Sequence, residues 1–581
     1  MRLLAASACL VALCAAHAGP SVAATAFVDV TVLSMTDGSA RQHRTVLVEG
    51  KSIIAIGPRS AVHIPIGATR VDGRGKFLMP GLADMHVHLA TKAELALYVA
   101  HGVTTVFNLN GRPAHLRWRA AAESGVLLAP RILSTGPLMN EARTAAQSVA
   151  EVDRVAAAGY DGVKVYNGVS AAEYGPLVRE ARRLGLLLVG HVAREPGFEA
   201  TLAARQSIAH AEEIVYTAFN SERNDRFDTI RLDESRLPAV ARQVRDAGVF
   251  VTPTLACFHD ILRQASELDA FLAAPQLKQL APWIRAGLEP PVNRYHDRYS
   301  PRDLAFLGAA YPFQQRLVKA LAQAGVRLLA GTDATLIGPV AGFALHEELE
   351  ELVRAGLTPV QALRAATVNA AAFLKRPGET GQVTVGSRAD LLLLGADPRR
   401  DIRHTRRIEG VMVAGRYHDR AALAASVAAL PGAYEATRRS VAQALVAQPG
   451  SVDGLLDEED PLDMLGADVL ASVARERGQA GAMRVLEEAS AAGSRLAGEE
   501  LVNNAGYVLL GQSELALAVA LLRFNTARHP DSANAHDSLA DAYARSGETA
   551  RARESYGRAL QIDPAYINAD GARRYLAATA P

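Results

Sequence analysis

Eight short apolar segments, each followed by a stretch of helical periodicity, recur through the middle of this chain. Short strands that alternate with helices predict a parallel α/β sheet, and eight such units predict a (β/α)8 TIM barrel, here over residues 81–375. A doubly wound open sheet is the alternative, but no glycine-rich dinucleotide-binding pattern follows the first segment. The segments are 77–89, 102–109, 131–136, 162–166, 186–192, 207–213, 249–255 and 326–333.

Two β-rich pieces flank this region. Residues 26–58 alternate apolar and polar side chains around two pairs of an acidic residue and a glycine, which indicates hairpins. A similar pattern returns between residues 381 and 416. We therefore expect one small composite β-sandwich domain, interrupted by the barrel and built from residues 25–80 and 376–420.

Beyond about residue 420 the chain is rich in alanine and shows no strand pattern. Residues 497–530 and 531–564 match at an offset of 34 residues, which resembles tetratricopeptide helix pairs. We expect an all-α, tetratricopeptide-like domain at 497–581, packed against a helical linker region at 421–496. Such helices could bind a protein partner, join two copies of the chain or only cover the barrel. A chance alanine-rich hairpin is a further alternative.

The first residues have the pattern of an export signal, with Arg2, an apolar run from Leu3 to Ala16 and small residues at its end. We expect residues 1–24 to be a signal peptide that is removed, so that the mature protein is periplasmic or secreted. No later apolar run is long enough to cross a bilayer, which predicts no membrane span after that removal.

Composition excludes several classes of partner and site. The 62 basic and 61 acidic residues nearly balance, so no strong positive field is available to hold nucleic acid. Two of the three cysteines, Cys9 and Cys14, lie in the expected signal peptide, which leaves Cys257 alone. A disulfide within the mature chain and a metal site made of thiolates are therefore excluded.

Residue types that bind metals follow the predicted strands at their carboxyl ends. In a parallel barrel these ends form the functional face, and alternate residues of a strand point the same way. His86 and His88 are two positions apart, so both imidazoles can face one ion. Each candidate alone is more typical of a satisfied polar side chain or a helix cap, so the prediction depends on their combination. The predicted metal ligands are His86, His88, Lys164, His191, His210 and Asp333.

Lys164 is the unusual member of this set, because an ammonium group beside metal ions would be repelled and desolvated. Its pKa should fall, and the neutral amine can then add carbon dioxide to form a carbamate, N6-carboxylysine. This anionic group could bridge two divalent ions at a position where a carboxylate would otherwise be expected. The alternative is a lysine whose ammonium group extends from the barrel mouth into solvent.

The segments PGLADMHVHL (80–89), YDGVKVYNGV (160–169), LLAGTDA (328–334) and the helical stretch 346–374 together resemble the metal-dependent amidohydrolase superfamily. The resemblance covers about residues 27–420 and is strongest to the exported imidazolonepropionase-like and Xaa-Pro dipeptidase-like branch. It implies a centre of two divalent ions, usually zinc, held by the six residues above. Relatives often have an Arg-Asp pair where this chain has Phe107 and Asn108, so the substrate pocket is expected to differ.

These features predict hydrolysis of a carbon–nitrogen bond, amide or peptide, in a small substrate such as a dipeptide. A hydroxide that bridges the two ions would be the nucleophile, with Asp333 as general acid and base. Tyr166, two residues after Lys164, would contact the oxyanion or a substrate carboxylate, or would only pack at the rim. Lactonase, cyclic amidohydrolase or deaminase chemistry is an alternative, and so is a catalytically silent barrel whose helical tail binds a partner.

The remaining histidines of the mature chain are expected at the surface, His43 and His63 among them. His346 and Glu347 begin the helix that follows the last predicted strand, where a role on the helix surface is expected.

Overall fold

The computed structural model describes residues 24–580 apart from several short gaps. The expected signal peptide therefore lies almost wholly outside the described residues. Within the described part of the chain, no helix is both long and apolar enough to cross a membrane. The gaps are 141–143, 223–226, 291, 294, 297–298, 336–337, 461–462, 565 and 567.

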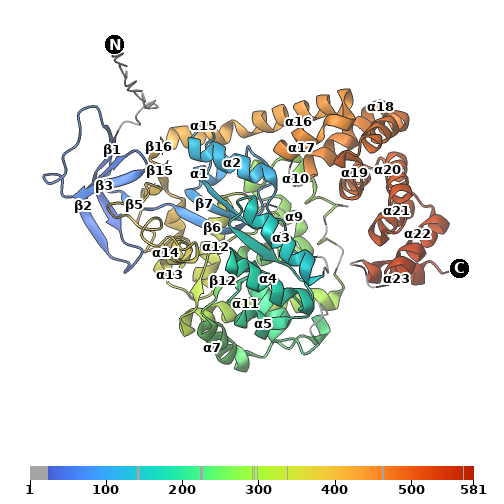
Figure 1. The fold of residues 1–581 in the computed structure, drawn as a ribbon, viewed down its shortest axis with the longest axis horizontal. Helices are drawn as coiled ribbons and strands as arrows, with labels where there is room; N and C mark the ends of the chain where they lie inside the picture. Colours follow the sequence, from blue (N-terminus) through green and yellow to red (C-terminus); the bar gives the residue numbers. More distant parts are fainter. Residues whose placement is uncertain are drawn as a thin grey trace, which may run out of the picture.

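One eight-stranded sheet joins strands from two distant parts of the chain (Figure 1). Its strands are β1 (Thr25–Leu33), β2 (Ala40–Glu49), β3 (Ser52–Gly57), β4 (Thr69–Asp72), β5 (Phe77–Pro80), β14 (Leu391–Leu394), β15 (Ile408–Val413) and β16 (Arg416–Asp419). The order is β16-β15-β14-β5-β1-β2-β3, with β4 beside β1. The central pair is antiparallel, with Pro80 opposite Leu391 and Phe77 opposite Leu394. The two β-rich pieces of the sequence therefore meet in one sheet.

Two parallel sheets hold the strands of the central region. The three-stranded sheet contains β6 (Leu82–Val87), β7 (Val103–Asn108) and β8 (Arg131–Ser134). The five-stranded sheet contains β9 (Gly162–Val165), β10 (Leu187–Gly190), β11 (Ser207–Ala209), β12 (Phe250–Thr252) and β13 (Arg327–Leu328). Single parallel bridges join Thr135 to Gly162 and Val87 to Ala334 at the margins of these sheets. Each of the eight predicted segments contains one of these strands, which confirms the mixed α/β fold with parallel sheets.

Helices follow the parallel strands, and their sequences explain where they begin and end. The helices are α1 (Leu95–Ala100), α2 (Pro113–Ser124), α3 (Ala145–Ala157), α4 (Ala171–Arg183), α5 (Gly197–Ala203), α6 (Ala211–Ala218), α7 (Leu237–Ala247), α8 (Leu255–Ser266), α9 (Leu268–Leu272), α10 (Pro282–Ala286), α11 (Pro301–Ala324), α12 (Phe343–Arg354), α13 (Pro359–Ala365) and α14 (Val368–Phe373). Ser170 and Ser300 cap α4 and α11 by accepting hydrogen bonds from the third helical amide. Gly325 ends α11 with a φ of 88°, a conformation that favours glycine.

The C-terminal part of the described chain is helical, as predicted. Its helices are α15 (Arg420–Ala428), α16 (Leu430–Ala447), α17 (Asp453–Glu459), α18 (Met464–Ala491), α19 (Glu499–Gly511), α20 (Leu515–Arg528), α21 (Ala533–Arg545), α22 (Thr549–Ile562) and α23 (Ala569–Ala578). Helices α19 and α21 begin 34 residues apart, as do α20 and α22, which matches the offset in the sequence. A tetratricopeptide identity for these helices stays a prediction.

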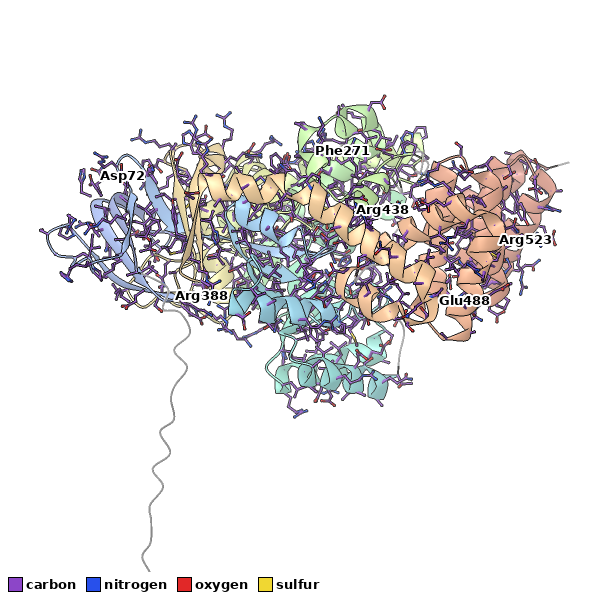
Figure 2. All side chains as sticks on the ribbon, turned by 90° about the horizontal axis from the view of Figure 1, so that it is seen from above. Asp72, Phe271, Arg388, Arg438, Glu488 and Arg523 are labelled. Atoms are coloured by element: carbon purple, nitrogen blue, oxygen red, sulfur yellow. The ribbon has the colours of Figure 1, made fainter. Side chains whose placement is uncertain are left out.

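Helices α15 and α16 run along the parallel sheets, from the eight-stranded sheet toward the C-terminal helices (Figures 1 and 2). Arg438 of α16, labelled in Figure 2, donates to Asp468 of α18 at 2.8 Å. Glu458 of α17 accepts hydrogen bonds from the Trp118 indole at 3.2 Å and from Arg117 at 2.6 Å, both on α2. These contacts attach the helical part to the central α/β region.

Candidate metal centre

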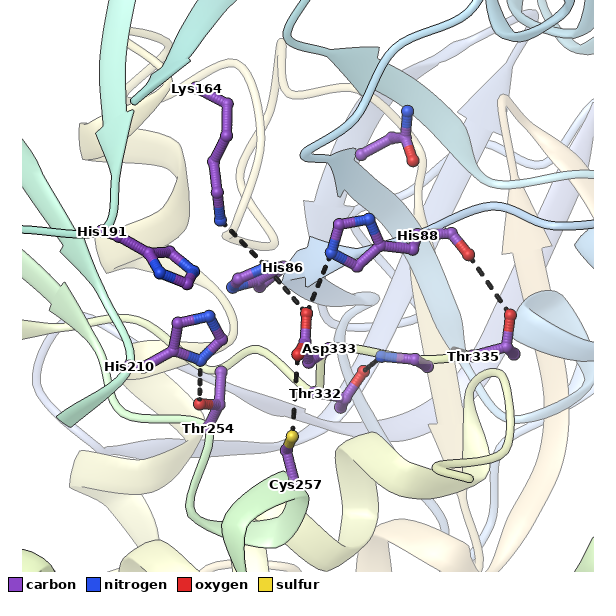
Figure 3. A network of polar contacts seen from close by, with 12 residues as sticks. His86, His88, Lys164, His191, His210, Thr254, Cys257, Thr332, Asp333 and Thr335 are labelled. Carbon is purple, nitrogen blue, oxygen red and sulfur yellow. Dashed lines mark hydrogen bonds and ion pairs between the residues drawn. The ribbon is translucent and has the colours of Figure 1, made fainter. Parts of the chain in front are cut away.

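The six predicted ligands come from five strands and meet in one place (Figure 3). His86 lies in β6 and His88 directly follows it, while Lys164 lies in β9. His191 follows β10, His210 follows β11, and Asp333 lies in the loop after β13. All six side chains are buried or nearly so, and His86 has no exposed surface.

Short distances connect these side chains around Asp333. Its Oδ1 lies 2.9 Å from Nε2 of His86 and 3.0 Å from Nε2 of His88. Nζ of Lys164 lies 3.4 Å from Nε2 of His86. The His210 ring centroid is 4.6 Å from that of His86 and 4.8 Å from that of His191. One ligand atom from each of His86, His210 and Asp333 fits within a mutual distance of 4.8 Å, so these three residues alone could hold an ion.

The outer nitrogens of two histidines are already engaged. Nδ1 of His210 lies 2.7 Å from Oγ1 of Thr254. Nδ1 of His191 lies 3.1 Å from Oε1 of Glu213, which is itself paired with Arg194 at 2.6 Å. Partners of this kind orient an imidazole and leave Nε2 with its lone pair toward a metal. The arrangement is therefore typical of metal-binding histidines.

Burial and neighbouring charges set the protonation of the site. Burial lowers the pKa of His86 to about 3, with a further contribution from Lys164, so the imidazole is neutral. Burial also lowers the pKa of Lys164 to about 8, although Asp333 and Glu213 oppose the change. Burial alone would raise the pKa of Asp333, but His86 and His88 hold it well below its usual range. The site thus contains neutral imidazoles and an ionised carboxylate.

Backbone strain and unpaired atoms also indicate a ligand. His210 and Asp333 have φ values of 72° and 59°, in the left-handed region that residues with a side chain rarely adopt. Nδ1 of both His86 and His88 is buried without a hydrogen-bond partner in the described part of the chain. Imidazole and carboxylate groups are the ligands that zinc and similar divalent ions prefer. The residues present therefore fit the metal centre that the sequence predicts.

Tyr166 packs against one of the predicted ligands. Its ring centroid lies 4.1 Å from that of His191, with 37° between the two planes. The packing alternative from the sequence is therefore satisfied, and a contact with substrate stays a prediction.

Four supporting residues carry no prediction from the sequence: Asp84, Glu213, Thr254 and Cys257. Asp84 accepts hydrogen bonds from the Thr332 hydroxyl at 2.7 Å and from the His86 amide at 3.3 Å, which ties β6 to the loop that carries Asp333. The Cys257 thiol lies 3.6 Å from Oδ2 of Asp333 and donates to it. Asp84 stands two positions before His86 in the same strand, and that spacing is a signal for it. Cys257 and Glu213 carry no such signal.

The expectation that the other histidines lie at the surface is wrong for His115 and His346. His43 and His63 are exposed, but His115 and His346 are 0% and 1% exposed. An imidazole can be buried when it is neutral and both nitrogens are paired. His346 lies near the Thr405 hydroxyl at 2.8 Å and the carbonyl of His101 at 3.0 Å.

His115 supports the segment that follows His88. Its Nε2 donates to the carbonyl of Leu89 at 3.0 Å, and its Nδ1 accepts from the Asn108 amide at 2.9 Å and from the backbone of Arg112 at 3.0 Å. Oδ1 of Asn108 accepts from the Leu89 amide at 3.0 Å, which fixes the orientation of that side chain. Because Nε2 already carries a proton, the charged ring would need a second proton on Nδ1. That proton would point at two N–H donors, so the buried ring must stay neutral.

We expect His115 to make the protein sensitive to mild acid. Burial lowers its pKa from 6.5 to about 4. The folded pKa lies below the unfolded one, so the stabilisation is full above pH 6.5 and is lost as the pH falls toward 4. Between pH 7 and pH 5 this loss amounts to about 2 kcal/mol. The free energy of unfolding is measured with urea at both pH values. Between pH 7 and pH 5 it should fall less in H115Q than in the wild type, whereas H63Q should show the full wild-type decrease. Equal decreases in the wild type and H115Q would contradict the assignment.

Known proteins give an independent comparison. A model of the amidohydrolase family matches residues 77–417. Imidazolonepropionase of Rubrobacter xylanophilus is 28% identical over 372 residues, which cover 61% of this chain and 84% of the relative. Adenine deaminase 2 of Agrobacterium fabrum is 24% identical over 58% of this chain, and the match spans about half of the deaminase, 48%.

Two solved structures agree with this comparison. Bottromycin amidohydrolase has a TM-score of 0.55 and 26% identity, and the match covers 70% of this chain and 90% of the other. A Xaa-Pro dipeptidase with bound methionine has a TM-score of 0.53 over 68% of this chain and the whole of the other, but at 16% identity it supports the fold alone. Because the family model covers more than half of the chain, this protein belongs to the amidohydrolase family.

Proposed function

We propose that this protein is a metal-dependent hydrolase that cleaves an amide or peptide bond in a small substrate such as a dipeptide. The convergence of four histidines and Asp333 on one buried site carries the proposal. His86, His88, Lys164, His191, His210 and Asp333 would hold two divalent ions, with zinc the best match to the donor set. Family membership supports hydrolysis of a carbon–nitrogen bond but leaves the substrate open.

We further infer that Lys164 acts as a carbamate. Its side chain is buried, and Nζ points at the histidines rather than at solvent. A protonated lysine in this position would compete with a cation, whereas a carbamate would add two oxygen ligands. Addition of carbon dioxide to the neutral amine forms the new N–C bond and releases one proton.

The two parallel sheets are proposed to close into a (β/α)8 barrel. The bridges from Thr135 to Gly162 and from Val87 to Ala334 support this closure, because they lie where the two sheets meet on either side. The barrel would occupy residues 81–375, with the composite β-sandwich at 25–80 and 376–420. The shared offset of α19–α22 supports tetratricopeptide-like repeats within 497–581, next to the helical linker at 421–496.

The chemistry at the site divides between the ions and the protein. Bound divalent ions would polarise the substrate carbonyl and lower the pKa of a water molecule. Asp333 would take a proton from the attacking water and pass it to the leaving nitrogen, which departs as an amine. The Cys257 thiol, which donates to Oδ2 of Asp333, holds the carboxylate so that Oδ1 faces His86 and His88. Glu213 and Thr254 keep His191 and His210 oriented.

Deaminase or cyclic amidohydrolase chemistry is the second candidate. It is favoured by the curated relatives, which are named imidazolonepropionase and adenine deaminase. Both candidates use the same six residues and differ in the substrate. Export to the periplasm or the medium, through the signal peptide at 1–24, is also proposed.

The function is tested with the full-length protein after its metal content has been measured. We expect about two divalent ions per chain and turnover of at least one amide in a panel of dipeptides, N-acyl amino acids, lactones and nucleobases, with products followed by mass spectrometry. A chelator should lower turnover at least about ten-fold, and added zinc should restore it. Unchanged turnover in fully metal-free protein would exclude the metal-dependent mechanism.

A further inference from the structure

A cavity of about 1770 Å³ lies between the C-terminal helices and the connections that follow the parallel strands. One wall comes from the segment after β7, the segment after α6 and the long connection between α8 and α11. The opposite wall comes from α18, α19 and α21–α23. Pockets for small ligands usually measure about 300–1,000 Å³, so this cavity has room for more than one amino-acid unit.

The helical wall is acidic. Among its described residues, five carboxylates and one arginine, Arg574, line the cavity. Asp537 and Asp541 lie one turn apart on α21. The hydroxyls of Tyr507 and Tyr556 donate to Asp541, the first at 2.8 Å. In the same way Asp537 accepts from two neutral groups of the described chain, Tyr566 at 2.5 Å and Asn568 at 3.0 Å.

Neutral donors satisfy the oxygens of these carboxylates but leave their negative charge in place. In the described part of the chain, neither Asp537 nor Asp541 forms an ion pair with a basic side chain. Burial and the charge of Asp541 raise the pKa of Asp537 to about 6. Two adjacent and unneutralised charges on a cavity wall are costly, and a cationic ligand would relieve that cost.

A second observation on the same wall is independent of the charges. Asn503 of α19 lines the cavity and is 7% exposed, and its Oδ1 has no hydrogen-bond partner. A buried acceptor without a donor is rare in folded proteins and needs an explanation. An ammonium or guanidinium group in the cavity would supply the missing N–H donor.

The opposite wall suits the rest of a peptide. Trp283 lines it, as do Phe227 and Phe306, which stack with 4.7 Å between ring centroids. Aromatic faces also attract cations. Arg112 and Arg231 line this wall too and could pair with a carboxylate. This wall also carries carboxylates, so its charges balance, whereas the helical wall has an excess of negative charge; the balancing residues are Arg112, Arg231, Arg302, Asp228, Glu289 and Asp303.

One residue of the cavity wall, Asn110, is near in sequence to a residue that supports the candidate metal centre. Asn110 lines the cavity and is two residues beyond Asn108, a span of at most about 7 Å. Asn108 accepts a hydrogen bond from the amide of Leu89, the residue after His88. None of the six predicted ligands is among the described residues that line the cavity, so the cavity neighbours the candidate metal centre along the chain and is separate from it.

We propose that this cavity binds a cationic peptide segment of the substrate, with lysine or arginine side chains held by Asp537 and Asp541. The inference rests on the proposed hydrolase function and narrows its substrate class to peptides longer than a dipeptide. Arg112 or Arg231 binds the carboxylate end, and the acidic helical wall selects the cationic residues. The C-terminal helices are thus part of substrate recognition.

The test compares two N-acetylated tetrapeptides, Arg-Arg-Ala-Ala and its neutral analogue with citrulline in place of arginine. Binding to the metal-loaded full-length protein is measured by calorimetry at low salt, and products are followed by mass spectrometry. We expect the arginine peptide to bind at least about ten-fold more tightly, with a preference that decreases as salt is added. The double variant D537N/D541N should lower this preference to less than about two-fold.

Two further variants keep the test decisive if the double variant folds poorly. Asp570 lines the cavity and is exposed, so D570K reverses a charge without disturbing a core and should also lower the preference. Glu554 of α22 is exposed and does not line the cavity, so E554Q should keep the full preference. Equal binding of the two peptides to the wild type would overturn the proposal, as would an unchanged preference in D570K and in folded D537N/D541N.

The outcomes also separate this inference from the proposed function. A preference for the arginine peptide in a protein that hydrolyses no amide would support the cavity and contradict the hydrolase. Hydrolysis of small amides without any charge preference would support the hydrolase and contradict the role of the cavity.

Discussion

D333N is expected to keep its metal ions and to lose turnover by roughly two to four orders of magnitude, the usual scale for removing a general acid and base. Asparagine preserves the shape of the side chain and one oxygen that can face His86 and His88, but it cannot accept a proton. Metal content by elemental analysis and turnover are measured on the same samples.

The matched comparison for D333N is H210A. His210 has no proposed role in proton transfer, and its ring faces those of His86 and His191. H210A should therefore have a lower metal content than the wild type, while its turnover per bound ion falls less than that of D333N. A D333N protein with full metal and nearly normal turnover would show that another group is the base, and the proposed role of Asp333 would have to be abandoned.

K164A is expected to lose at least about 100-fold in turnover together with part of its metal, because the proposed carbamate that bridges the two ions is absent. Short carboxylates such as acetate or propionate could occupy the space left by the buried side chain. We expect them to restore part of the activity in a concentration-dependent manner.

K375A is the control for this experiment, since Lys375 is exposed and its ammonium group donates to the carbonyl of Gly185. It should keep normal turnover and should not respond to carboxylates. K164A protein that retains two ions and full activity would contradict the bridging role. The mass of the intact wild-type protein under conditions that preserve carbamates gives a second and direct readout.

The strands and the candidate ligands could be predicted from the sequence because each depends on a short-range pattern. A strand buried on both faces is a continuous apolar run, and a polar residue at its end stands out, as Lys164 and His191 do. His86 and His88 share a face because side chains alternate along a strand. The same reasoning could have included Asp84, which belongs to the same strand.

The rest of the site depends on contacts between distant segments. Glu213 and Thr254 orient two histidines from positions that look like an ordinary helix start and a loop. In the sequence Cys257 is an isolated thiol, yet in the fold it contacts Asp333 from α8. The sequence predicts a surface position for the remaining histidines as a group, and only the three-dimensional arrangement shows that both nitrogens of His115 are paired.

The cavity beside the helices could not be predicted for the same reason. Its walls lie several hundred residues apart in sequence, from Asn110 to Asp570. The periodicity of α19–α22 could be detected because it is local, but the face of the helices that meets the α/β region could not. The family model ends at residue 417, before these helices begin, so it does not describe this wall either.

The pairing of β5 with β14 has a consequence for synthesis of the protein. Phe77–Pro80 finds its partner strand only when Leu391–Leu394 has left the ribosome. At about 5–20 residues per second this delay is on the order of tens of seconds. During that time β1 has β2 as a neighbour, but β5 exposes one edge to any other chain, and unpaired edges promote aggregation. We therefore expect the nascent chain to be most prone to aggregation until its second β-rich piece has been translated.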